Sequence, residues 1–498
     1  MGAAATQFST RDWKQPVLAA SALIFCASAV GITVAGAGGS SSSQLLMGSA
    51  AIIIAIAGAL CFAFQLPIIA VARFTFIASF FFKGDLNLFK VDEVEDPSGL
   101  NVSLTLVVAL FLMIYDVVQD RSEERIFPQS FSYLCVALFL CAAISVVFGD
   151  SAALGGYSLF SFLTSVLIAF AVASHFSNRV RLLQLIGGVA AGLIFTGAVA
   201  LSQYVVDFPT TLPSFGTGTE DELLGTQSQI LSRVPAFMRT PTEMAWVLSA
   251  LIPLVVALVV TRVHDLAWRY KAFLLSGAFA GVVAIILSLA RGSWISLVVG
   301  IVMVVALGWY KLPTRERSSY AARTAVSIIF ACLLLMPFAG RIYDRLNDDD
   351  QGSALIRVPL METALRMIDD NPLVGVGING YRPAMTRYDN TGIFVSQVFP
   401  NPVHNVFAHI TAEIGVPGGI IFCLLFAACL FECFRSMAAG DRLMFAVSLG
   451  IAAGLLAFII SAMKEPGSLG SARPPIRTLF FLFGTGLAVA RMRRRLML

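Results

Sequence analysis

Long uninterrupted apolar runs dominate this chain of 498 residues. Many of them approach the length of about 20 residues that a helix needs to cross the hydrocarbon core of a bilayer. A backbone within lipid must satisfy its own hydrogen bonds, so each run is predicted to be helical. The runs do not alternate between apolar and polar residues, as the strands of a membrane β-barrel do. The sequence therefore predicts an all-α fold, a polytopic transmembrane helix bundle.

Hydrophobic residues make up 57% of the chain and charged residues only 13%, which excludes an ordinary water-soluble globule. We expect about 12–14 spans. The span at 66–82 is the least regular because it carries Arg73, and the long span at 403–432 is expected to begin outside the membrane. The predicted spans lie at 16–37, 45–64, 66–82, 99–118, 130–149, 157–174, 182–203, 243–261, 272–290, 293–310, 323–340, 403–432, 441–462 and 476–490.

The distribution of basic residues predicts the orientation of these spans. The tail "RMRRRLML" is expected in the cytoplasm, and counting spans back from it places the basic loops "HFSNRVR" and "CFRSMAAGDR" on the same side. The loops "GGSSSS" and "VDEVEDPSG" then lie outside, and both termini are cytoplasmic. The net charge of +4 comes from basic residues in short loops, which indicates membrane topology rather than nucleic-acid binding.

Two long outer loops, at about 204–242 and 341–402, divide the chain. We expect N-terminal spans at 1–203, spans with arginine-bearing outer loops at 204–340, a large outer loop at 341–402, and C-terminal spans at 403–498. The large loop contains "ALIRVPLMETALRMI", which is apolar on one face of a helix. It is therefore predicted to form an ordered, partly helical cap on the membrane.

Several arginines lie on the outer side, where the distribution of charge in membrane proteins disfavours them. Arg291 lies between two apolar spans, Arg233 and Arg239 precede another, and Arg357 lies in the large loop. Taken singly, each has an ordinary explanation as a snorkelling or solvent-facing side chain. Taken together, they predict a binding site for a pyrophosphate, because guanidinium groups match phosphate oxygens.

Two further features lie close to these arginines in the sequence. Gly375 and Gly377, in "NPLVGVGINGY", either let a ligand approach the backbone or simply make turns. Thr240 or Thr242 is expected to cap the helix that follows, and Glu243 suits the first turn of that helix.

The segment "NPVHNVFAHITAEIGVPGG" holds two of the four histidines. His404 and His409 are five residues apart and do not share a helix face, so we expect no metal site. His409 is four residues from both Asn405 and Glu413 and is expected to meet one of them. His404 stands at the outer entrance of the helix. It is either a capping or interfacial residue, or a general base or substrate-orienting donor.

Together, "ALIRVPLMETALRMIDDNPLVGVGINGY" and "VHNVFAHITAEIGVPGG" resemble the O-antigen ligase and Wzy-type polymerase superfamily of bacterial membrane glycosyltransferases. The upstream "LARGSW" is similar to the SRGxW motif of that family and carries Arg291. The resemblance covers residues 233 to 419. Its matching residues are Arg357, Asn371, Pro372, Gly375, Gly377, His404, Asn405, Glu413, Gly415 and Gly418.

A fourth motif departs from the family pattern. The stretch "RVPAFMRTPTEMA" has Ala236 or Phe237 where the family has Gly-Thr, and Thr242 where asparagine is common. The register differs by about one residue, so Arg233 and Arg239 compete for the role of the family's arginine, and Arg233 is favoured.

The resemblance implies a helical bundle of the GT-C type and a transfer reaction at the periplasmic face of the bacterial inner membrane. The donor is a glycan on undecaprenyl pyrophosphate, held by Arg291 and by Arg233 or Arg239. His404 is expected to activate or orient the acceptor hydroxyl for an attack that inverts the anomeric centre, and neither a metal nor another cofactor is expected to take part. Arg357, Asn405, Gly375 and Gly377 are assigned to substrate binding.

The acceptor is left open by the resemblance. It is lipid A–core for a ligase and a second lipid-linked glycan for a polymerase, and protein O-glycosylating relatives share the same motifs. Membrane lipids are expected around the bundle, and no nucleic acid is expected. A different class is a transporter of a small anion such as bicarbonate, although a transporter favours polar groups near mid-membrane. A scaffolding protein would not account for the arginines.

Overall fold

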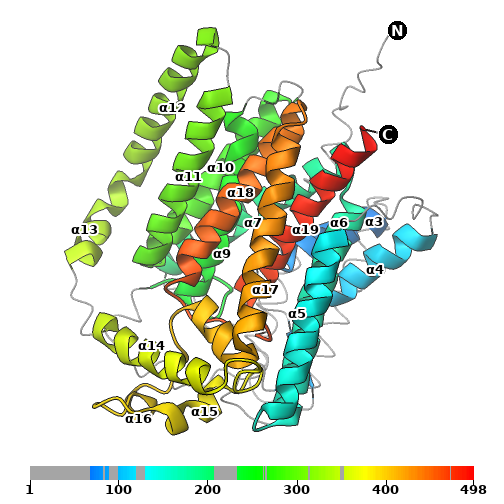
Figure 1. Cartoon of the computed structure of the whole chain (residues 1–498). Coiled ribbons are helices and arrows are strands. Elements are labelled where there is room, and N and C mark those ends of the chain that lie inside the picture. The colour runs from blue at the N-terminus through cyan, green and yellow to red at the C-terminus, as the bar shows by residue number, and fades with distance from the viewer. Residues whose placement is uncertain are drawn as a thin grey trace, which may run out of the picture.

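A computed structural model shows the predicted all-α, polytopic helix bundle (Figure 1). The predicted spans at 16–37 and 45–64 lie outside the residues that the structure describes, as does most of the outer loop at 204–242. The structure describes residues 68–81, 85–88, 99–118, 129–206, 233–261, 263, 266–311, 314–347, 353–471 and 473–497.

Eight helices in this part of the chain are long and apolar enough to cross a membrane. Each follows one of the apolar runs in the sequence, which is why the predicted spans and the observed helices overlap. They are α5 (Gln129–Phe148), α6 (Ala152–His175), α7 (Arg179–Val206), α9 (Pro241–Val260), α10 (Trp268–Leu287), α11 (Arg291–Lys311), α17 (Val406–Met437) and α18 (Arg442–Ala462).

The predicted span at 99–118 is only partly helical. The run at 99–118 begins with strand β2 (Leu100–Ser103), which pairs antiparallel with β1 (Asp85–Leu88) before α4 (Leu104–Val118). The Ser103 hydroxyl accepts the Leu106 N–H at 3.0 Å and so caps this shorter helix. The other helices of the bundle are α3 (Ile68–Ala78), α12 (Thr314–Leu335), the 3₁₀ turn η2 (Met336–Phe338), α13 (Ala339–Asn347) and α19 (Pro474–Arg495).

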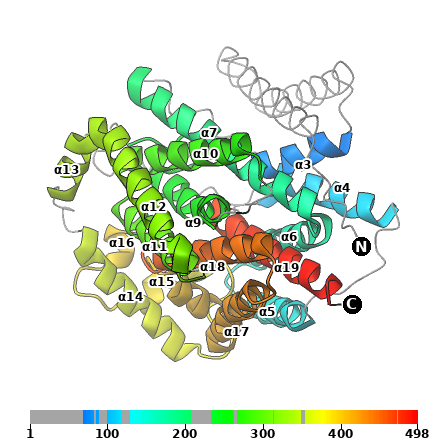
Figure 2. The same ribbon diagram turned by 90° about the horizontal axis from the view of Figure 1, so that it is seen from above.

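The centre of the bundle is formed by α9, α18 and α19. Helix α18 packs against α9, α11 and α17, while α19 packs against α6 and α17, and α10 packs against α7 and α9. Seen along the bundle, α9, α18 and α19 lie inside, and α12 and α13 lie at the periphery (Figure 2). Helix α9 is accordingly buried on nearly all sides, from Glu243 to Leu258.

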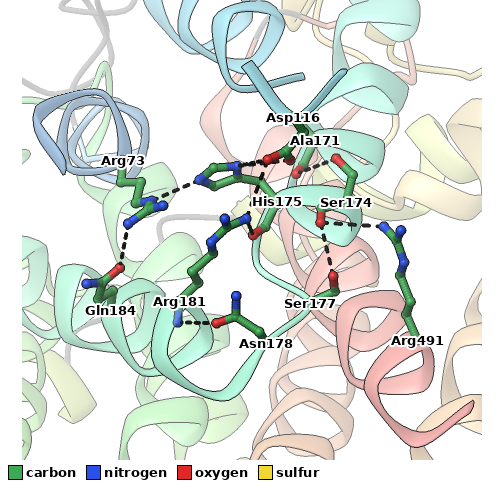
Figure 3. A network of polar contacts seen from close by, with 10 residues as sticks. All are labelled: Arg73, Asp116, Ala171, Ser174, His175, Ser177, Asn178, Arg181, Gln184 and Arg491. Carbon is green, nitrogen blue, oxygen red and sulfur yellow. Dashed lines mark hydrogen bonds and ion pairs between the residues drawn. The ribbon is translucent and has the colours of Figure 1, made fainter. Parts of the chain in front are cut away.

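A buried polar network explains how α3 tolerates Arg73 (Figure 3). The Arg73 Nε donates to His175 Nε2 at 2.8 Å, and its Nη1 donates to Gln184 Oε1 at 3.0 Å. The proton of the neutral imidazole therefore lies on Nδ1, which is 3.0 Å from the Asp116 carboxylate. Arg181 contacts the same carboxylate at 3.4 Å. Each buried charge in this network thus has an opposite charge or a hydrogen-bond partner.

The large loop forms a helical cap over one end of the bundle, called here the capped end (Figure 1). It consists of α14 (Ser353–Asp370), α15 (Tyr381–Tyr388) and α16 (Val395–Val398), and α14 packs against α17. Leu360, Met367 and Tyr381 form part of a small core beneath the cap. The prediction of an ordered, partly helical loop is therefore confirmed.

Candidate functional site

Helix α17 is broken near its start at the capped end. Gly415 has φ +75° and ψ 171°, which separates a short first half from a long second half. The break leaves backbone carbonyl groups without partners inside the helix. The segment "NPLVGVG" (371–377) donates hydrogen bonds to them. The carbonyl oxygens of Ala412 and Glu413 accept the N–H groups of Val376 and Gly377 at 2.9 and 3.0 Å. This backbone pairing fixes the cap against the helix and satisfies groups that the break would otherwise leave without partners.

Gly375 and Gly377 lie within this pairing. Their φ angles are +69° and +97°, in the region that favours glycine. A Cβ atom on Gly375 would overlap with the backbone of Glu413, and one on Gly377 would overlap with the backbone of Gly149. The close approaches that require both glycines are thus to the protein's own backbone.

The pair that the spacing predicted between His409 and Glu413 is present. The His409 Nε2 is 3.3 Å from Glu413 Oε1, and both side chains are buried. The Ser468 hydroxyl donates a hydrogen bond to the other carboxylate oxygen, and the Tyr381 ring meets the imidazole edge-on. His409 and Glu413 therefore connect the broken helix, the cap and the loop between α18 and α19.

Asn405 is the N-cap of α17. Its side-chain oxygen accepts the N–H groups of Phe407 and Ala408 at 3.0 and 3.1 Å. This oxygen is therefore committed to the helix start. His404 comes directly before the cap, half-buried, with its ring 5.9 Å from the Phe399 ring.

The imidazole of His404 is held in its neutral form. Its Nδ1 is buried and has no hydrogen-bond partner in the described part of the chain. Burial, together with the positive charges of Arg357 and Arg473, lowers the pKa of His404 to about 4, although the Pro402 backbone opposes this shift. A neutral imidazole with an unpaired nitrogen is able to accept a proton from a hydroxyl group.

Arg233 connects two of the sequence motifs. Its Nε donates to the Ser288 backbone oxygen at 2.9 Å, and its Nη2 donates to Thr242 at 3.1 Å. Thr240 is the observed N-cap of α9, since its hydroxyl accepts the Glu243 N–H at 3.1 Å. Arg239 stands directly before that cap.

The turn between α10 and α11 brings a third arginine to the capped end. Arg291 is the first residue of α11. Leu289, two residues earlier, has φ +55°, and its carbonyl oxygen accepts the Arg345 Nε at 3.1 Å. A Cβ atom on Gly292 would lie 3.4 Å from the Lys464 Cδ, so Lys464 stands beside the start of α11.

The loop between α18 and α19 contributes charged residues that sequence reasoning missed. The Arg473 Nη1 is 3.6 Å from Glu243 Oε1. Burial and the like charge of Glu243 raise the pKa of Glu465 to about 7, against the opposing effects of Arg357, Arg233 and Arg473. The only signal in the sequence is the set of charges in "KEPGSLGSAR", a loop between two apolar runs.

Three of these residues, Arg233, Arg357 and Arg473, act electrostatically on Glu465 and are called here the basic cluster. Lys464 directly precedes Glu465 and stands beside the start of α11, whose first residue is Arg291. His404 adjoins the basic cluster, because Arg357 and Arg473 act on the imidazole as well. The described residues contain no group of three or more His, Cys, Asp or Glu side chains arranged to hold a metal ion.

Fold and site together define a multi-pass membrane protein with an arginine-rich site and a neutral histidine at one end of its bundle. The family model described as O-antigen ligase matches residues 276–423, which confirms the predicted resemblance over that stretch. The match includes Arg291, Arg357 and His404, so over that stretch the chain is similar to O-antigen ligases. No curated protein matches the chain.

Proposed function

We propose that the protein is a membrane glycosyltransferase that moves a glycan from undecaprenyl pyrophosphate to an acceptor hydroxyl group. The acceptor is either another glycan, as for a polymerase, or lipid A–core, as for an O-antigen ligase. One observation carries the proposal: a neutral histidine with an unpaired, buried nitrogen adjoins a cluster of arginines at one end of the bundle. The similarity to O-antigen ligases over 276–423 supports it.

In this mechanism Arg233, Arg291 and Arg357 bind the pyrophosphate. The acceptor oxygen attacks the anomeric carbon while the bond from that carbon to the pyrophosphate oxygen breaks. The electron pair leaves with the pyrophosphate, and the arginines stabilise the developing charge. The His404 Nδ1 takes the proton of the hydroxyl group. Attack opposite the leaving group inverts the anomeric centre, and neither a metal nor another cofactor takes part.

The capped end faces the periplasm in this proposal, and both termini are cytoplasmic. The basic end of α19, with Arg493, Arg494 and Arg495, lies at the opposite end of the bundle from α14 (Figure 1). Basic residues favour the cytoplasmic side of a membrane, which supports this orientation.

Transfer by the purified protein tests the proposal. The wild type is expected to move glycan from a lipid-pyrophosphate donor, and His404→Ala and Arg291→Ala are expected to lose this activity. Arg366→Ala is the control, because the half-buried Arg366 lies on the same helix as Arg357 but contacts the Tyr388 backbone oxygen at 3.5 Å and Glu362 at 3.9 Å. Full transfer by folded His404→Ala and Arg291→Ala would overturn the mechanism. A ladder on the carrier lipid identifies a polymerase, and glycan on a new acceptor identifies a ligase.

The alternative is a transporter of a small anion such as bicarbonate. The break in α17 favours it, because transporters place binding sites at discontinuous helices. The break lies near one end of the bundle, which favours the transferase. Uptake of bicarbonate into liposomes that depends on the protein would support the alternative.

A further inference from the structure

A second group of charged side chains joins the ends of α17 and α19, at the end of the bundle opposite the cap (Figure 1). The Glu432 Oε2 accepts a hydrogen bond from the Arg493 Nη2 at 2.7 Å, and its Oε1 accepts one from the Arg494 Nη2 at 3.2 Å. The Arg435 Nη1, one turn along α17, lies 3.8 Å from the same Oε1. These four residues are called here the Glu432 cluster. Three guanidinium groups share one carboxylate, which leaves an excess of two positive charges.

Arg493 is the member of the cluster whose hydrogen bonds are incomplete. Its side chain is 1% exposed, and its Nε and Nη1 have no hydrogen-bond partner in the part of the chain that the structure describes. A guanidinium fork matches both oxygens of a carboxylate, but the second oxygen of Glu432 accepts from Arg494 instead. The buried hydroxyl of Ser436, one turn beyond Glu432, also lacks a partner there. Buried donors without acceptors are unfavourable, so the cluster is short of hydrogen-bond acceptors.

The Glu432 cluster lies where the protein meets lipid headgroups. With a rise of about 1.5 Å per residue, Arg493 lies about 28 Å along α19 from Pro474, which is close to the thickness of about 30 Å of a bilayer core. On α17, the Arg435 guanidinium lies 5.6 Å from the centre of the Phe431 ring. Phe431 and Phe434 are exposed, and exposed rings on a membrane-spanning helix face lipid. Arg435 therefore covers a lipid-facing ring with its stem and carries its charge to the membrane surface.

We propose that the Glu432 cluster binds the phosphodiester headgroup of an anionic membrane lipid between α17 and α19. Arg435 and Arg494 contact the phosphate, since their side chains are 51% and 27% exposed. When these two arginines turn to the phosphate oxygens, the Glu432 Oε1 becomes available to Arg493, which then forms the two-bond pair that it now lacks. The lipid thus supplies the missing acceptors. A zwitterionic lipid is disfavoured, because its ammonium group meets the excess of positive charge. This site is separate from the proposed transfer reaction at the capped end.

Wild-type protein is sufficient for the first test. The probe is phosphatidylglycerol, and phosphatidylcholine with the same acyl chains is the comparison. Native mass spectrometry of the protein in a neutral detergent gives the affinity for each lipid. We expect phosphatidylglycerol to bind about tenfold more tightly than phosphatidylcholine. Equal affinities for the two lipids would overturn the inference.

The double variant Arg435→Gln/Arg494→Gln locates the site. It removes the two proposed phosphate ligands and keeps the buried pair of Glu432 and Arg493. Its affinity for phosphatidylglycerol is expected to fall by about tenfold or more, and its affinity for phosphatidylcholine is expected to stay the same. Wild-type affinity for phosphatidylglycerol in the folded double variant would overturn the inference. If the double variant does not fold, Arg435→Gln alone decides, since half of that side chain is exposed, and unchanged affinity in it would overturn the inference.

The matched control is Lys311→Gln/Arg315→Gln. It also removes two exposed positive charges, from the end of α11 and the start of α12, which lie at the same end of the bundle but away from α17 and α19 (Figures 1 and 2). Its affinity for phosphatidylglycerol is expected to equal that of the wild type. Equal losses in the two double variants would show a general attraction of charge and would overturn a specific site.

Competition with inorganic phosphate distinguishes a lipid headgroup from a free anion. Inorganic phosphate carries the charge but has no acyl chains to pack along the exposed rings of α17. At the same concentration as phosphatidylglycerol it is expected to displace little of the bound lipid. Displacement of most of the lipid at that concentration would assign the site to a free anion and overturn the inference.

Discussion

Arg233 and Ser288 are joined by a hydrogen bond of 2.9 Å from the guanidinium Nε to the backbone oxygen, across 55 residues of sequence. Ser288 is the C-cap of α10, so this bond ties the segment before α9 to the turn that carries Arg291. The second contact of Arg233, to Thr242, anchors the same guanidinium to the first turn of α9. The position of Arg233 is thus determined by two separate helix ends.

Replacement of Arg233 by lysine is expected to lower transfer by about tenfold to a hundredfold. Lysine has no planar group that reaches the Ser288 carbonyl and Thr242 together, and it does not match a phosphate with two parallel hydrogen bonds. Loss of one charge-assisted hydrogen bond corresponds to about 1.5–3 kcal/mol. The measurement is the initial rate of transfer at a low donor concentration.

Arg239→Lys is the matched control, because Arg239 lies in the same segment and competed with Arg233 in the sequence comparison. Its transfer rate is expected to stay within about threefold of the wild type, a difference below 1 kcal/mol. A larger loss in Arg239→Lys than in Arg233→Lys would reverse the assignment.

Gly375→Ala is expected to prevent stable folding of the cap. The added Cβ atom would overlap with the Glu413 backbone, and φ +69° disfavours any side chain by roughly 1–2 kcal/mol before this overlap is counted. Gly340→Ala is the control, since a Cβ atom there meets nothing within 4 Å. Thermal unfolding in detergent measures both variants. Equal melting temperatures would show that the backbone pairing at the break is dispensable.

Local sequence patterns predicted much of this structure. The apolar runs predicted the long helices, and the pattern of apolar residues on one face of residues 354–368 predicted the helical cap. Spacing of four residues paired His409 with Glu413, and the residue types before α9 allowed Thr240 as its cap. Each of these features depends on residues within one or two turns of a helix, so a single segment contains the information.

The basic cluster depends on contacts between distant segments, and this explains why only part of it was predicted. Arg473 and Glu243 meet across more than 200 residues of sequence, and Glu465 acquires its surroundings only when α18 and α19 pack into the bundle. The same holds for Arg73, whose partners His175 and Gln184 lie on other helices. No pattern within one segment indicates which charges a loop will meet.

Asp116→Asn is expected to reduce the free energy of unfolding by about 3–5 kcal/mol, because the change leaves the buried Arg181 without its counter-charge and weakens the bond to His175. Chemical denaturation in detergent gives this value. Asp150→Asn provides the comparison. Its partner Arg387 lies 2.6 Å away, but both side chains are about half exposed, so the expected loss is below about 1 kcal/mol. Similar losses in the two variants would contradict a structural role for the buried network.

The neutrality of His404 predicts how the rate of transfer depends on pH. At a donor concentration well below KM, where the pH dependence reports the free enzyme, the wild-type rate is expected to stay constant as the pH falls to about 5, because the pKa of His404 is about 4. Arg357→Gln removes a nearby positive charge, and this stabilises the imidazolium form and raises the pKa of His404. The rate of this variant is therefore expected to begin its fall at a higher pH than the wild-type rate, since a protonated imidazole accepts no proton from the acceptor. Burial is the larger cause of the shift, so the pKa stays below its ordinary value of about 6.5.

Arg366→Gln is the matched variant for this test, because it removes a positive charge from the same helix at a half-buried residue that does not act on His404. Its pH profile is expected to coincide with that of the wild type. If Arg357→Gln lowers the rate equally at every pH, Arg357 acts on the substrate alone and not on the histidine. If the acid limb moves in Arg357→Gln and stays in place in Arg366→Gln, the proton acceptor of the reaction is the imidazole that Arg357 keeps neutral.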